Sequence, residues 1–301
     1  MLLKQLIKKG VETVSCGYPE REAREMVFAF LEHHLGTKRH THVVYPSFEV
    51  SDEDASVSFS AFERMASAEP LQDVTGHADF YGRRFRVTPD VLIPRPETEL
   101  LCRETLQLWH AGTGLRDMSP AFLNPCVLDL CTGSGCIAWT LALEMPGAKV
   151  TAVDISDGAL AVASSQGFSE EMARTSAGSP RFVKADVLAG PSASGLSEQY
   201  DILVSNPPYV MDKEKALMRP NVLDHEPHLA LFVSDDDPLI FYRAIASWAL
   251  AVLKPSGYGI VEINEALGPD TADLFHSAGL SDVRIIRDLS DRDRFISFRR
   301  M

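Results

Sequence analysis

The sequence predicts an α/β fold of the doubly wound type, preceded by a small all-α domain and a connecting β-hairpin. Three observations lead to this prediction. From Cys126 onward, short apolar runs alternate with helical patterns, as in parallel strands joined by helices. The first of these runs leads into a glycine-containing turn. Residues 1–68, in contrast, carry only the apolar spacing of helices.

Composition places the chain among soluble globular proteins. It has 301 residues, a net charge of −13, 45% hydrophobic and 24% charged residues. So acidic a chain is poorly suited to hold a bare nucleic-acid backbone. No apolar run is long enough to span a bilayer, and the first ten residues lack the pattern of a signal peptide. None of the five cysteines forms a C-x-x-C pair, which favours free thiols in a reducing compartment. We therefore expect a cytoplasmic protein without a bound metal.

The N-terminal segment is expected to be helical and to carry no chemistry of its own. Ser51 precedes three acidic residues, which predicts a helix N-cap followed by an acidic first turn. Four histidines could suggest a metal site, but their spacing favours solvated loop positions. They are His33, His34, His40 and His42.

The period of the apolar pattern changes after this segment. Residues 77–93 alternate around Gly82 and Pro89, which predicts a β-hairpin. Residues 93–99 (IPRPETE) are predicted to form a stiff polar loop before a helix. A proline-rich linker would look similar, but three charges between prolines are unusual for a linker.

The remaining elements follow from the apolar pattern. Strands are expected at residues 127–130, 149–154, 181–184, 202–205, 259–263, 283–286 and 295–298. Helices are expected at residues 136–144, 157–165, 239–253 and 269–277. Residues 110–124, 165–180 and 189–199 are small, polar and rich in glycine and serine, which predicts loops.

A rigid corner, Asn-Pro-Pro-Tyr, follows the strand at residues 202–205. Two prolines end the strand because neither has an N–H and both have a fixed φ. The Asn206 amide and the Pro207 carbonyl could therefore accept hydrogen bonds from the two N–H groups of one planar amine. An ordinary strand-terminating turn would carry the same residues.

The first strand and its turn indicate a nucleoside site. Glycines at 133 and 135 let the backbone approach a ligand, and the third glycine of a dinucleotide motif is replaced by Ala138. Asp154 ends the next strand, where a carboxylate can bind both hydroxyls of a ribose. Asp186 ends the third and suits an adenine amino group, although it could equally be a helix N-cap.

Together these motifs resemble the HemK/PrmC family, the S-adenosylmethionine-dependent protein-(glutamine-N5) methyltransferases of peptide chain release factors. The resemblance rests on D-x-x-T-G-S-G at 129–135, IPRPETE at 93–99, N-P-P-Y at 206–209, D-H-E-P at 224–227, Glu262-Ile263 and Asp288-Leu289. It implies a Rossmann-like class I methyltransferase sheet of seven strands with the last strand antiparallel. It also implies methyl transfer to the glutamine of the Gly-Gly-Gln motif of class-1 release factors. We expect a monomer that binds neither membrane nor, directly, nucleic acid.

The resemblance also divides the chain and assigns its site. Residues 1–70 would dock the release factor, 71–98 would form the hairpin and substrate-side loop, and 99–301 would form the methyltransferase domain. The expected catalytic residues are Asn206, Pro207, Pro208 and Tyr209, with Tyr209 packed against the substrate amide. The expected cofactor-binding residues are Asp129, Cys131, Thr132, Gly133, Ser134, Gly135, Asp154, Ile155, Asp186, Val187 and Asn206. The expected substrate-side residues are Arg95, Pro96, Glu97 and Glu99.

The sequence departs from the family pattern at several positions. Cys131 and Asn264 stand where glycine is usual, Val187 replaces a frequent aromatic residue, and Asp73-Val74 replaces a Tyr-hydrophobic pair. None of these changes removes a group that the chemistry needs.

Three alternatives remain at this point. Exocyclic-amine methyltransferases for adenine-N6 or guanine-N2 in nucleic acids also use N-P-P-Y, because those amines pose the same geometric problem. Enzymes that modify a ribosomal-protein glutamine share N-P-P-Y but typically differ after Ile-Pro-Arg. A non-catalytic nucleoside-binding module could keep the same fold. The net charge and the flanking motifs favour the release factor.

Overall fold

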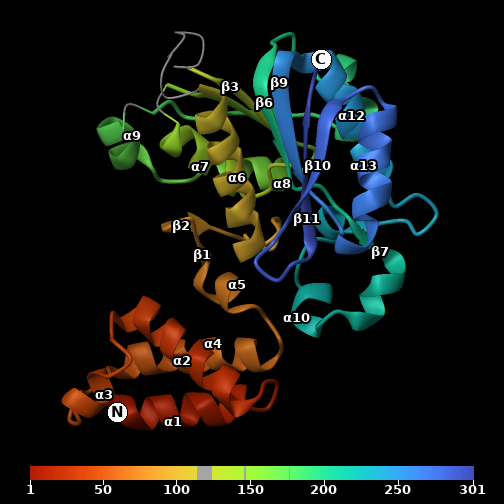
Figure 1. Ribbon diagram of the computed structural model, residues 1–301. Helices are drawn as coiled ribbons and strands as arrows, with labels where there is room; N and C mark the ends of the chain where they lie inside the picture. Colours follow the sequence, from red (N-terminus) through yellow and green to blue (C-terminus); the bar gives the residue numbers. More distant parts are fainter. Residues whose placement is uncertain (114–123, 146, 176) are drawn as a thin grey trace. The chain divides into compact units, whose positions relative to one another are not determined.

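The computed structural model describes residues 1–113, 124–145, 147–175 and 177–301. Two compact units divide this part of the chain. The first comprises Met1–His77 together with Met218–His225, and the second comprises Ala78–Leu217 together with Glu226–Met301. Figure 1 colours the chain in sequence order, so that the short C-terminal contribution to the first unit is the blue-green segment around α10 (Pro220–Leu223).

The first unit is built from helices. They are α1 (Leu3–Val14), α2 (Glu20–Leu35), α3 (Thr41–Val44), α4 (Asp52–Ala66), α5 (Leu71–Thr75) and α10. The predicted N-cap of α4 is confirmed, because Ser51 Oγ accepts a hydrogen bond from Asp54 N at 3.0 Å. Leu6, Val27 and Phe62 meet in its core because each lies on the apolar face of its own helix.

Three of the four histidines predicted in loops lie in helices instead, whereas His40 lies in the turn before α3. His33 and His34 lie in the last turn of α2, and His42 lies in α3. The ring of His34 stacks on Phe30 with 5.5 Å between ring centroids. A helix C-terminus suits a histidine because its carbonyls attract a proton-bearing ring. Among the described residues, no group of three or more His, Cys, Asp or Glu side chains could hold a metal ion.

The predicted hairpin is formed by β1 (His77–Phe80) and β2 (Arg83–Arg86). The predicted loop at residues 93–99 is shorter than expected, because α6 (Pro96–Thr113) already begins at Pro96. Proline suits a first helical position, where its fixed φ is helical and its missing N–H has no partner to lose. The loop predicted at residues 110–124 therefore begins later. Its residues 114–123 lie outside the described part of the chain.

The second unit is organised around a seven-stranded sheet with the order β10-β11-β9-β6-β3-β4-β5. Its strands are β3 (Cys126–Leu130), β4 (Lys149–Asp154), β5 (Arg181–Lys184), β6 (Tyr200–Ser205), β9 (Leu253–Glu262), β10 (Ser281–Arg287) and β11 (Asp293–Arg299). The last strand, β11, lies between β9 and β10 and runs antiparallel to both. The α/β fold and the antiparallel last strand are thus confirmed.

Most predicted strands appear at their expected positions. In the second unit, one strand and one loop differ from the prediction. β9 begins at Leu253 instead of residue 259, and Pro255 and Gly257 inside it hide its start in the sequence. The loop predicted at residues 165–180 contains α9 (Ser169–Thr175). Phe168 and Met172 pack against the core there, so two apolar anchors hold a segment whose composition is otherwise polar.

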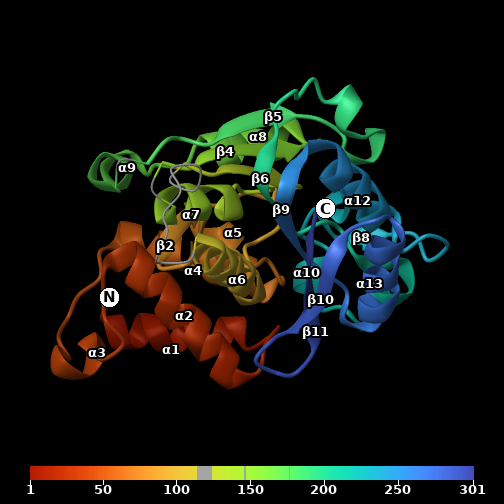
Figure 2. The same ribbon diagram turned by 45° about the horizontal axis from the view of Figure 1, so that its top comes forward.

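Helices cover both faces of the sheet. Alternate residues of β3 point to opposite sides: Val127 packs with the cluster containing α6 and α7 (Cys136–Glu144), and Leu128 with the cluster containing α12 (Ile240–Val252) and α13 (Gly268–Ser277). Figure 2 shows these two pairs of helices on either side of β6 and β9. Strands buried on both faces are nearly continuously apolar, as the sequence of β3 and β6 is.

Shorter elements complete the second unit. They are the helices α8 (Asp157–Ser164) and α11 (His228–Leu231), the paired strands β7 (Val210–Met211) and β8 (Phe232–Val233), and 3₁₀ turns at Val187–Ala189, Pro191–Ala193, Asp212–Leu217 and Glu265–Leu267. None of the helices in the described residues is both long and apolar enough to cross a bilayer.

The parallel strands bring distant residues to one edge of the sheet. In the register of the central strands, Leu130 is opposite Val153 on one side and Ser205 on the other. The segments that follow these three residues therefore leave the sheet next to one another. In doubly wound sheets this carboxyl edge is where ligands bind.

Candidate active site

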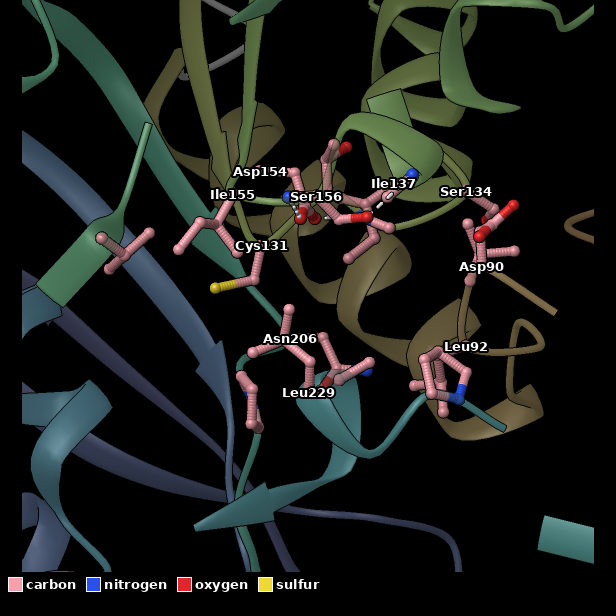
Figure 3. A pocket seen from close by; sticks show the side chains of 18 of the residues that line it. Asp90, Leu92, Cys131, Ser134, Ile137, Asp154, Ile155, Ser156, Asn206 and Leu229 are labelled. Carbon is pink, nitrogen blue, oxygen red and sulfur yellow. Dashed lines mark hydrogen bonds between the residues drawn. The ribbon is translucent and has the colours of Figure 1, made fainter. Parts of the chain in front are cut away.

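A cavity of about 210 Å³ lies at the carboxyl ends of β3, β4, β5 and β6. Figure 3 shows Cys131, which follows β3, beside Asn206, which follows β6, on the wall of this cavity. The predicted site residues that line it are Arg95, Cys131, Thr132, Gly133, Ser134, Asp154, Ile155, Asp186, Val187, Asn206 and Pro208. The predicted residues outside its lining are Pro96, Glu97, Glu99, Asp129, Gly135, Pro207 and Tyr209.

The two glycines of the β3–α7 turn are needed for different reasons. Gly133 has φ +54°, lines the cavity, and has nothing within 4 Å of the position that a Cβ would take. A ligand can therefore approach its backbone closely. Gly135 has φ +79°, and a Cβ there would lie 2.9 Å from the Cβ of Ala163. Gly133 thus leaves room for a ligand, whereas Gly135 lets α7 pack against α8.

The Asp154 carboxylate is fixed by backbone groups at the end of β4. Oδ2 accepts from Gly133 N at 2.9 Å, and Oδ1 accepts from Ser156 N at 3.0 Å. Burial raises the pKa of Asp154, against the opposing effect of these hydrogen bonds. Each oxygen keeps a second lone pair, so the carboxylate can still accept from two neighbouring hydroxyls of a ribose.

Asp129 supports the glycine turn from inside the sheet. Its side chain is fully buried, and Oδ2 accepts from Thr132 Oγ1 at 2.6 Å. Oδ1 has no hydrogen-bond partner among the described residues. Burial, the largest influence, raises the pKa of Asp129 to about 7 despite the bond from Thr132. Asp129 therefore holds the turn and is not itself part of the cavity wall.

The end of β5 supplies a second acid and an apolar wall. Asp186 Oδ1 accepts from Leu188 N at 2.8 Å, so Asp186 is the N-cap of the following 3₁₀ turn. It also lines the cavity, and its other oxygen is available to a ligand. Val187 is 4% exposed, and its carbonyl accepts from Trp248 Nε1 at 3.0 Å. The apolar wall at this end of the cavity therefore rests on the core.

Asn206 is held by a hydrogen-bond network that the sequence did not predict. Its Nδ2 donates to Thr98 Oγ1 at 3.1 Å, and Thr98 Oγ1 donates to Glu262 Oε2 at 2.9 Å. The other oxygen of Glu262 accepts from the Tyr209 hydroxyl at 2.9 Å. Tyr209 is therefore bound to Glu262 behind the cavity wall, and does not face the cavity as expected.

The expected substrate-side residues divide between the cavity and the scaffold. Arg95 lines the cavity and donates to the buried carboxylate of Glu226 at 2.5 Å. Glu99 accepts from Tyr81 N at 2.9 Å and so fixes the hairpin turn, where Tyr81 has φ +50°. Pro96 is the first residue of α6. Arg95 is thus the member of this set that a bound substrate could meet in the cavity.

Several cavity residues were missed because their signal in the sequence is weak. Thr98 is one threonine inside a charged motif, and nothing marks it as a neighbour of Asn206. Phe241, Leu229 and Leu92 line the cavity as ordinary apolar residues. The D-H-E-P motif marks Glu226 in the sequence, but its partner Arg95 lies 131 residues away. Only the fold connects them.

The residues present fit a nucleoside cofactor. One end of the cavity offers the open backbone at Gly133 and the carboxylate of Asp154, which suit a ribose. The wall at Val187 and Leu188 is apolar, which suits the face of a base. Asn206 lies on the wall at the end of β6, beside Cys131. A methyl donor bound along this cavity would therefore lie near the Asn206 amide, whose oxygen can accept a hydrogen bond from a substrate.

Comparisons with known proteins agree with this geometry. A family model described as Methyltransferase small domain matches residues 115–225. A protein from Bacteroides thetaiotaomicron named release factor glutamine methyltransferase is 42% identical over 79% of this chain and 78% of its own length. Another of that name, from Flavobacterium psychrophilum, is 34% identical over 98% of both chains. This chain belongs to the release factor glutamine methyltransferases.

A solved structure with a similar fold is the catalytic domain of hMettl16 in complex with an RNA hairpin of the MAT2A 3′UTR. It is 14% identical, covers 82% of both chains and gives a TM-score of 0.51. At this identity the likeness concerns the fold alone.

This release factor glutamine methyltransferase accommodates its departures from the family pattern. Cys131 adopts φ +62°, a left-handed conformation that glycine would adopt with less strain. Asn264 uses both ends of its amide: Nδ2 donates to Tyr209 O at 3.2 Å, and Oδ1 accepts from Ala266 N at 2.9 Å. Asn264 therefore anchors the backbone of Tyr209, a role that glycine could not fill.

Proposed function

We propose that this protein transfers a methyl group from S-adenosyl-L-methionine to a glutamine side-chain amide. The acceptor is N5 of the glutamine in the Gly-Gly-Gln motif of class-1 peptide chain release factors. The proposal rests on membership of the release factor glutamine methyltransferases. The observation that carries the chemistry is an oriented Asn206 amide on the wall of the cavity that Gly133 and Asp154 also line.

The chemical problem is the poor reactivity of an amide nitrogen, whose lone pair is delocalised into its carbonyl. Asn206 Oδ1 and the Pro207 carbonyl would accept hydrogen bonds from the two N–H groups of the substrate amide. These bonds orient the nitrogen and localise part of its lone pair, which is positioning combined with electrostatic preorganisation. Pro207 and Pro208 are both buried, and their fixed φ values keep the acceptor geometry rigid.

The cofactor supplies an electrophilic methyl group on a positively charged sulfur. Asp154 would accept from the two ribose hydroxyls, and Gly133 would allow the close approach of the backbone. Asp186, Val187 and Leu188 would surround the base. Attack of the amide nitrogen on the methyl group would give a cationic N-methylated amide and a neutral thioether. This cation is strongly acidic and would give its extra proton to water, so no strong base is assigned.

We extend the proposal to the partner and the cellular location. The helices of residues 1–70 would dock the release factor, while Arg95 would meet the substrate at the cavity. The enzyme would act as a monomer in the cytoplasm, a location consistent with the five free cysteines.

A nucleic-acid methyltransferase is the principal alternative, because an exocyclic base amine would present the same two N–H groups to Asn206. The net charge of −13 disfavours it, since such enzymes must hold a phosphate backbone.

The decisive experiment is mass spectrometry of the Gly-Gly-Gln tip peptide, after incubation of an intact class-1 release factor with the enzyme and S-adenosylmethionine. We expect a gain of one methyl group on the glutamine. In parallel, radiolabelled cofactor is offered with release factor, total RNA and DNA. Label in nucleic acid and none in the release factor would overturn the proposal.

The Asn206→Ala variant tests the assigned role. We expect methyl transfer to fall by about 10²-fold to 10³-fold, while the cofactor Kd changes much less. Asn124→Ala provides the matched control, because Asn124 is exposed and does not line the cavity. Full methyl transfer by Asn206→Ala would contradict the assigned role of Asn206, whereas absence of transfer by both wild type and variant would favour a non-catalytic binding module.

A further inference from the structure

Two buried side chains that are distant in sequence hold Asn206 through a chain of hydrogen bonds. Thr98, in the first turn of α6, is 2% exposed, and Glu262, at the end of β9, is 1% exposed. They are 164 residues apart in sequence, yet their oxygens are 2.9 Å apart. Thr98 lines the cavity, whereas neither Glu262 nor the backbone of β9 does, so the carboxylate acts on Asn206 from behind the wall through Thr98.

Counting protons fixes the orientation of the Asn206 amide. The Thr98 hydroxyl has one proton to donate, and an ionised Glu262 has none. Thr98 must therefore donate to Glu262 and can only accept from Asn206. The atom of Asn206 that faces Thr98 is consequently Nδ2, and Oδ1 is left as the acceptor at the other end of the amide.

We propose that Thr98 and Glu262 are positioning residues that present Asn206 Oδ1 to the substrate amide. This inference rests on the proposed function, because that function requires an acceptor for the substrate's N–H group. Without the Thr98–Glu262 pair, both orientations of the Asn206 amide become possible. In the inverted orientation, Asn206 Nδ2 would face the N–H group of the substrate amide. Two donors cannot form a hydrogen bond, so the substrate nitrogen would no longer be held in position.

The same chain of bonds strengthens the acceptor. The negative charge of Glu262 polarises the Thr98 hydroxyl, which then accepts more strongly from Asn206 Nδ2. Electron density in the Asn206 amide shifts toward Oδ1 as a result. Glu262 also accepts from Tyr209, so both ends of the Asn-Pro-Pro-Tyr corner are tied to one carboxylate. The corner is therefore rigid through its side chains as well as through its prolines.

The orientation depends on Glu262 being ionised, which makes it sensitive to pH. A protonated Glu262 could donate to Thr98, and Thr98 could then donate to Asn206 Oδ1, which inverts the amide. Burial raises the pKa of Glu262 above the usual value of about 4.3, although Thr98, Tyr209 and Arg294 act in the opposite direction. Activity is expected to fall as pH decreases through this raised pKa.

Titratable groups on several elements surround Glu262 and belong to the same electrostatic environment. They are Glu97 and Cys102 on α6, Cys136 on α7, Tyr209 after β6, Tyr242 on α12 and Arg294 on β11. Arg294 is the cation among them, and it also bonds to Asp288 at 3.1 Å. The fall in activity at low pH is the acid limb of the pH profile. This limb can be assigned to Glu262 only if it disappears when the hydroxyl of Thr98, which connects Glu262 to Asn206, is removed.

The test compares three single variants in the full-length enzyme. Thr98→Val keeps the shape but removes the hydroxyl, and Thr98→Ser keeps the hydroxyl. Thr105→Val is the matched control, because Thr105 is a fully buried threonine of the same helix whose hydroxyl donates to Leu101 O at 2.7 Å. We expect kcat to fall about 10-fold to 100-fold in Thr98→Val, with the cofactor Kd nearly unchanged. Thr98→Ser should recover most of kcat, and Thr105→Val should keep it.

The pH profile adds a readout that lost packing would not change. The acid limb of kcat should be present in wild type and Thr98→Ser and absent in Thr98→Val. Glu262→Gln, which keeps the shape of the side chain but removes its charge, should also lose the limb. An unchanged kcat and acid limb in Thr98→Val would overturn the inference.

Nuclear magnetic resonance measures the orientation without any methyl transfer. The chain has four asparagines, so selective ¹⁵N-asparagine labelling gives few side-chain signals. In wild type, the Nδ2 signals of Asn206, assigned with Asn206→Ala, should shift as Glu262 titrates. In Thr98→Val they should move from their wild-type positions and not follow pH. Identical behaviour in both proteins would refute the positioning role even if no release factor were methylated.

The two proposals can therefore fail separately. A wild-type enzyme that transfers no methyl group to release factors would contradict the proposed function, while the resonance data would still decide the orientation. Active wild type with equally active Thr98→Val would contradict the positioning role alone.

Discussion

Arg95 Nη2 and Glu226 Oε1 form an ion pair at 2.5 Å across 131 residues of sequence. The Glu226 side chain is 1% exposed and the Arg95 side chain 32% exposed. Glu226 also accepts from Ile93 N at 3.3 Å. Two conspicuous sequence motifs, IPRPETE and D-H-E-P, are therefore two halves of one buried polar contact at the cavity.

Removing one member of this pair should be more harmful than removing both. Arg95→Met leaves the buried carboxylate of Glu226 without its cation, and we expect the free energy of unfolding to fall by about 2–4 kcal/mol. Adding Glu226→Gln should restore a large part of that loss, because no buried charge remains. Urea unfolding of the two single variants and the double variant measures the coupling. Strictly additive losses would contradict a buried pair.

The two glycines of the β3–α7 turn should give opposite phenotypes when each is changed to alanine. Gly133→Ala places a methyl group in open space at the cavity, so we expect cofactor affinity to fall while stability falls by about 1 kcal/mol from the positive φ. Gly135→Ala forces a Cβ against Ala163, and we expect a loss of about 2–4 kcal/mol. Calorimetric titration with S-adenosylhomocysteine and thermal unfolding separate the two effects.

Each glycine variant serves as the control for the other. If Gly133→Ala bound the cofactor product as tightly as wild type, the assignment of the open backbone to a ligand would be wrong.

Asp129 should make stability depend on pH in the direction opposite to that of a salt-bridged acid. Burial raises its pKa to about 7 in the folded protein, whereas an unfolded chain has about 3.9. Between about pH 4 and about pH 7 the unfolded state releases this proton and the folded state keeps it. The contribution of Asp129 to stability therefore falls as pH rises through this range and is constant above it.

Thermal unfolding across this pH range checks the Asp129 effect. The Asp129→Asn variant cannot release the proton, so its Tm relative to wild type should rise as pH rises from about 4 to about 7. Asp273→Asn, at an exposed position of α13, should follow wild type throughout. A difference between Asp129→Asn and wild type that did not change with pH would show that Asp129 is ionised in the fold.

Cys131 should report the occupancy of the cavity. Its thiol lines the cavity, and burial raises its pKa well above the usual value, so alkylation by a maleimide at neutral pH should be slow. Alkylation should accelerate with increasing pH, and S-adenosylhomocysteine should block it. Cys16 is exposed and serves as the internal control, whose labelling the ligand should not change. Peptide mass spectrometry quantifies both; equal protection of the two thiols would contradict the assigned site.

The strands of the sheet could be predicted because burial on both faces leaves a clear apolar run between turn residues. β4 and β5 occupy the predicted residues for this reason. The pattern was less informative where a residue plays two parts. Residues 93–99 are predicted to form a stiff loop because their prolines have fixed dihedral angles, but at the first helical position a proline favours a helix. α9 depends on two apolar contacts within a polar segment, and single-sequence patterns underweight such contacts.

The site could be predicted as far as individual strand ends allow. Asp154, Gly133 and Asn206 lie in one cavity because parallel strands bring their carboxyl ends together. The hydrogen bond from Tyr209 to Glu262 could not be predicted, because the two residues come together only through the pairing of β6 with β9. Thr98 was missed because its contact with Asn206 depends on how α6 packs against the end of β6. Sequence motifs identify the groups that can react, while tertiary pairing decides which groups hold them.

The place of β11 in the sheet has a consequence for biosynthesis. Although residues 293–299 are synthesised after the other six strands of this sheet, β11 is an inner strand that separates β9 from β10. A nascent chain that ends before Asp293 therefore has unpaired edges on both β9 and β10, which can recruit strands from other chains. Such a chain is exposed to aggregation until β11 has been synthesised and has inserted between β9 and β10. The folding of this sheet thus depends on a strand that is made after both of its neighbours.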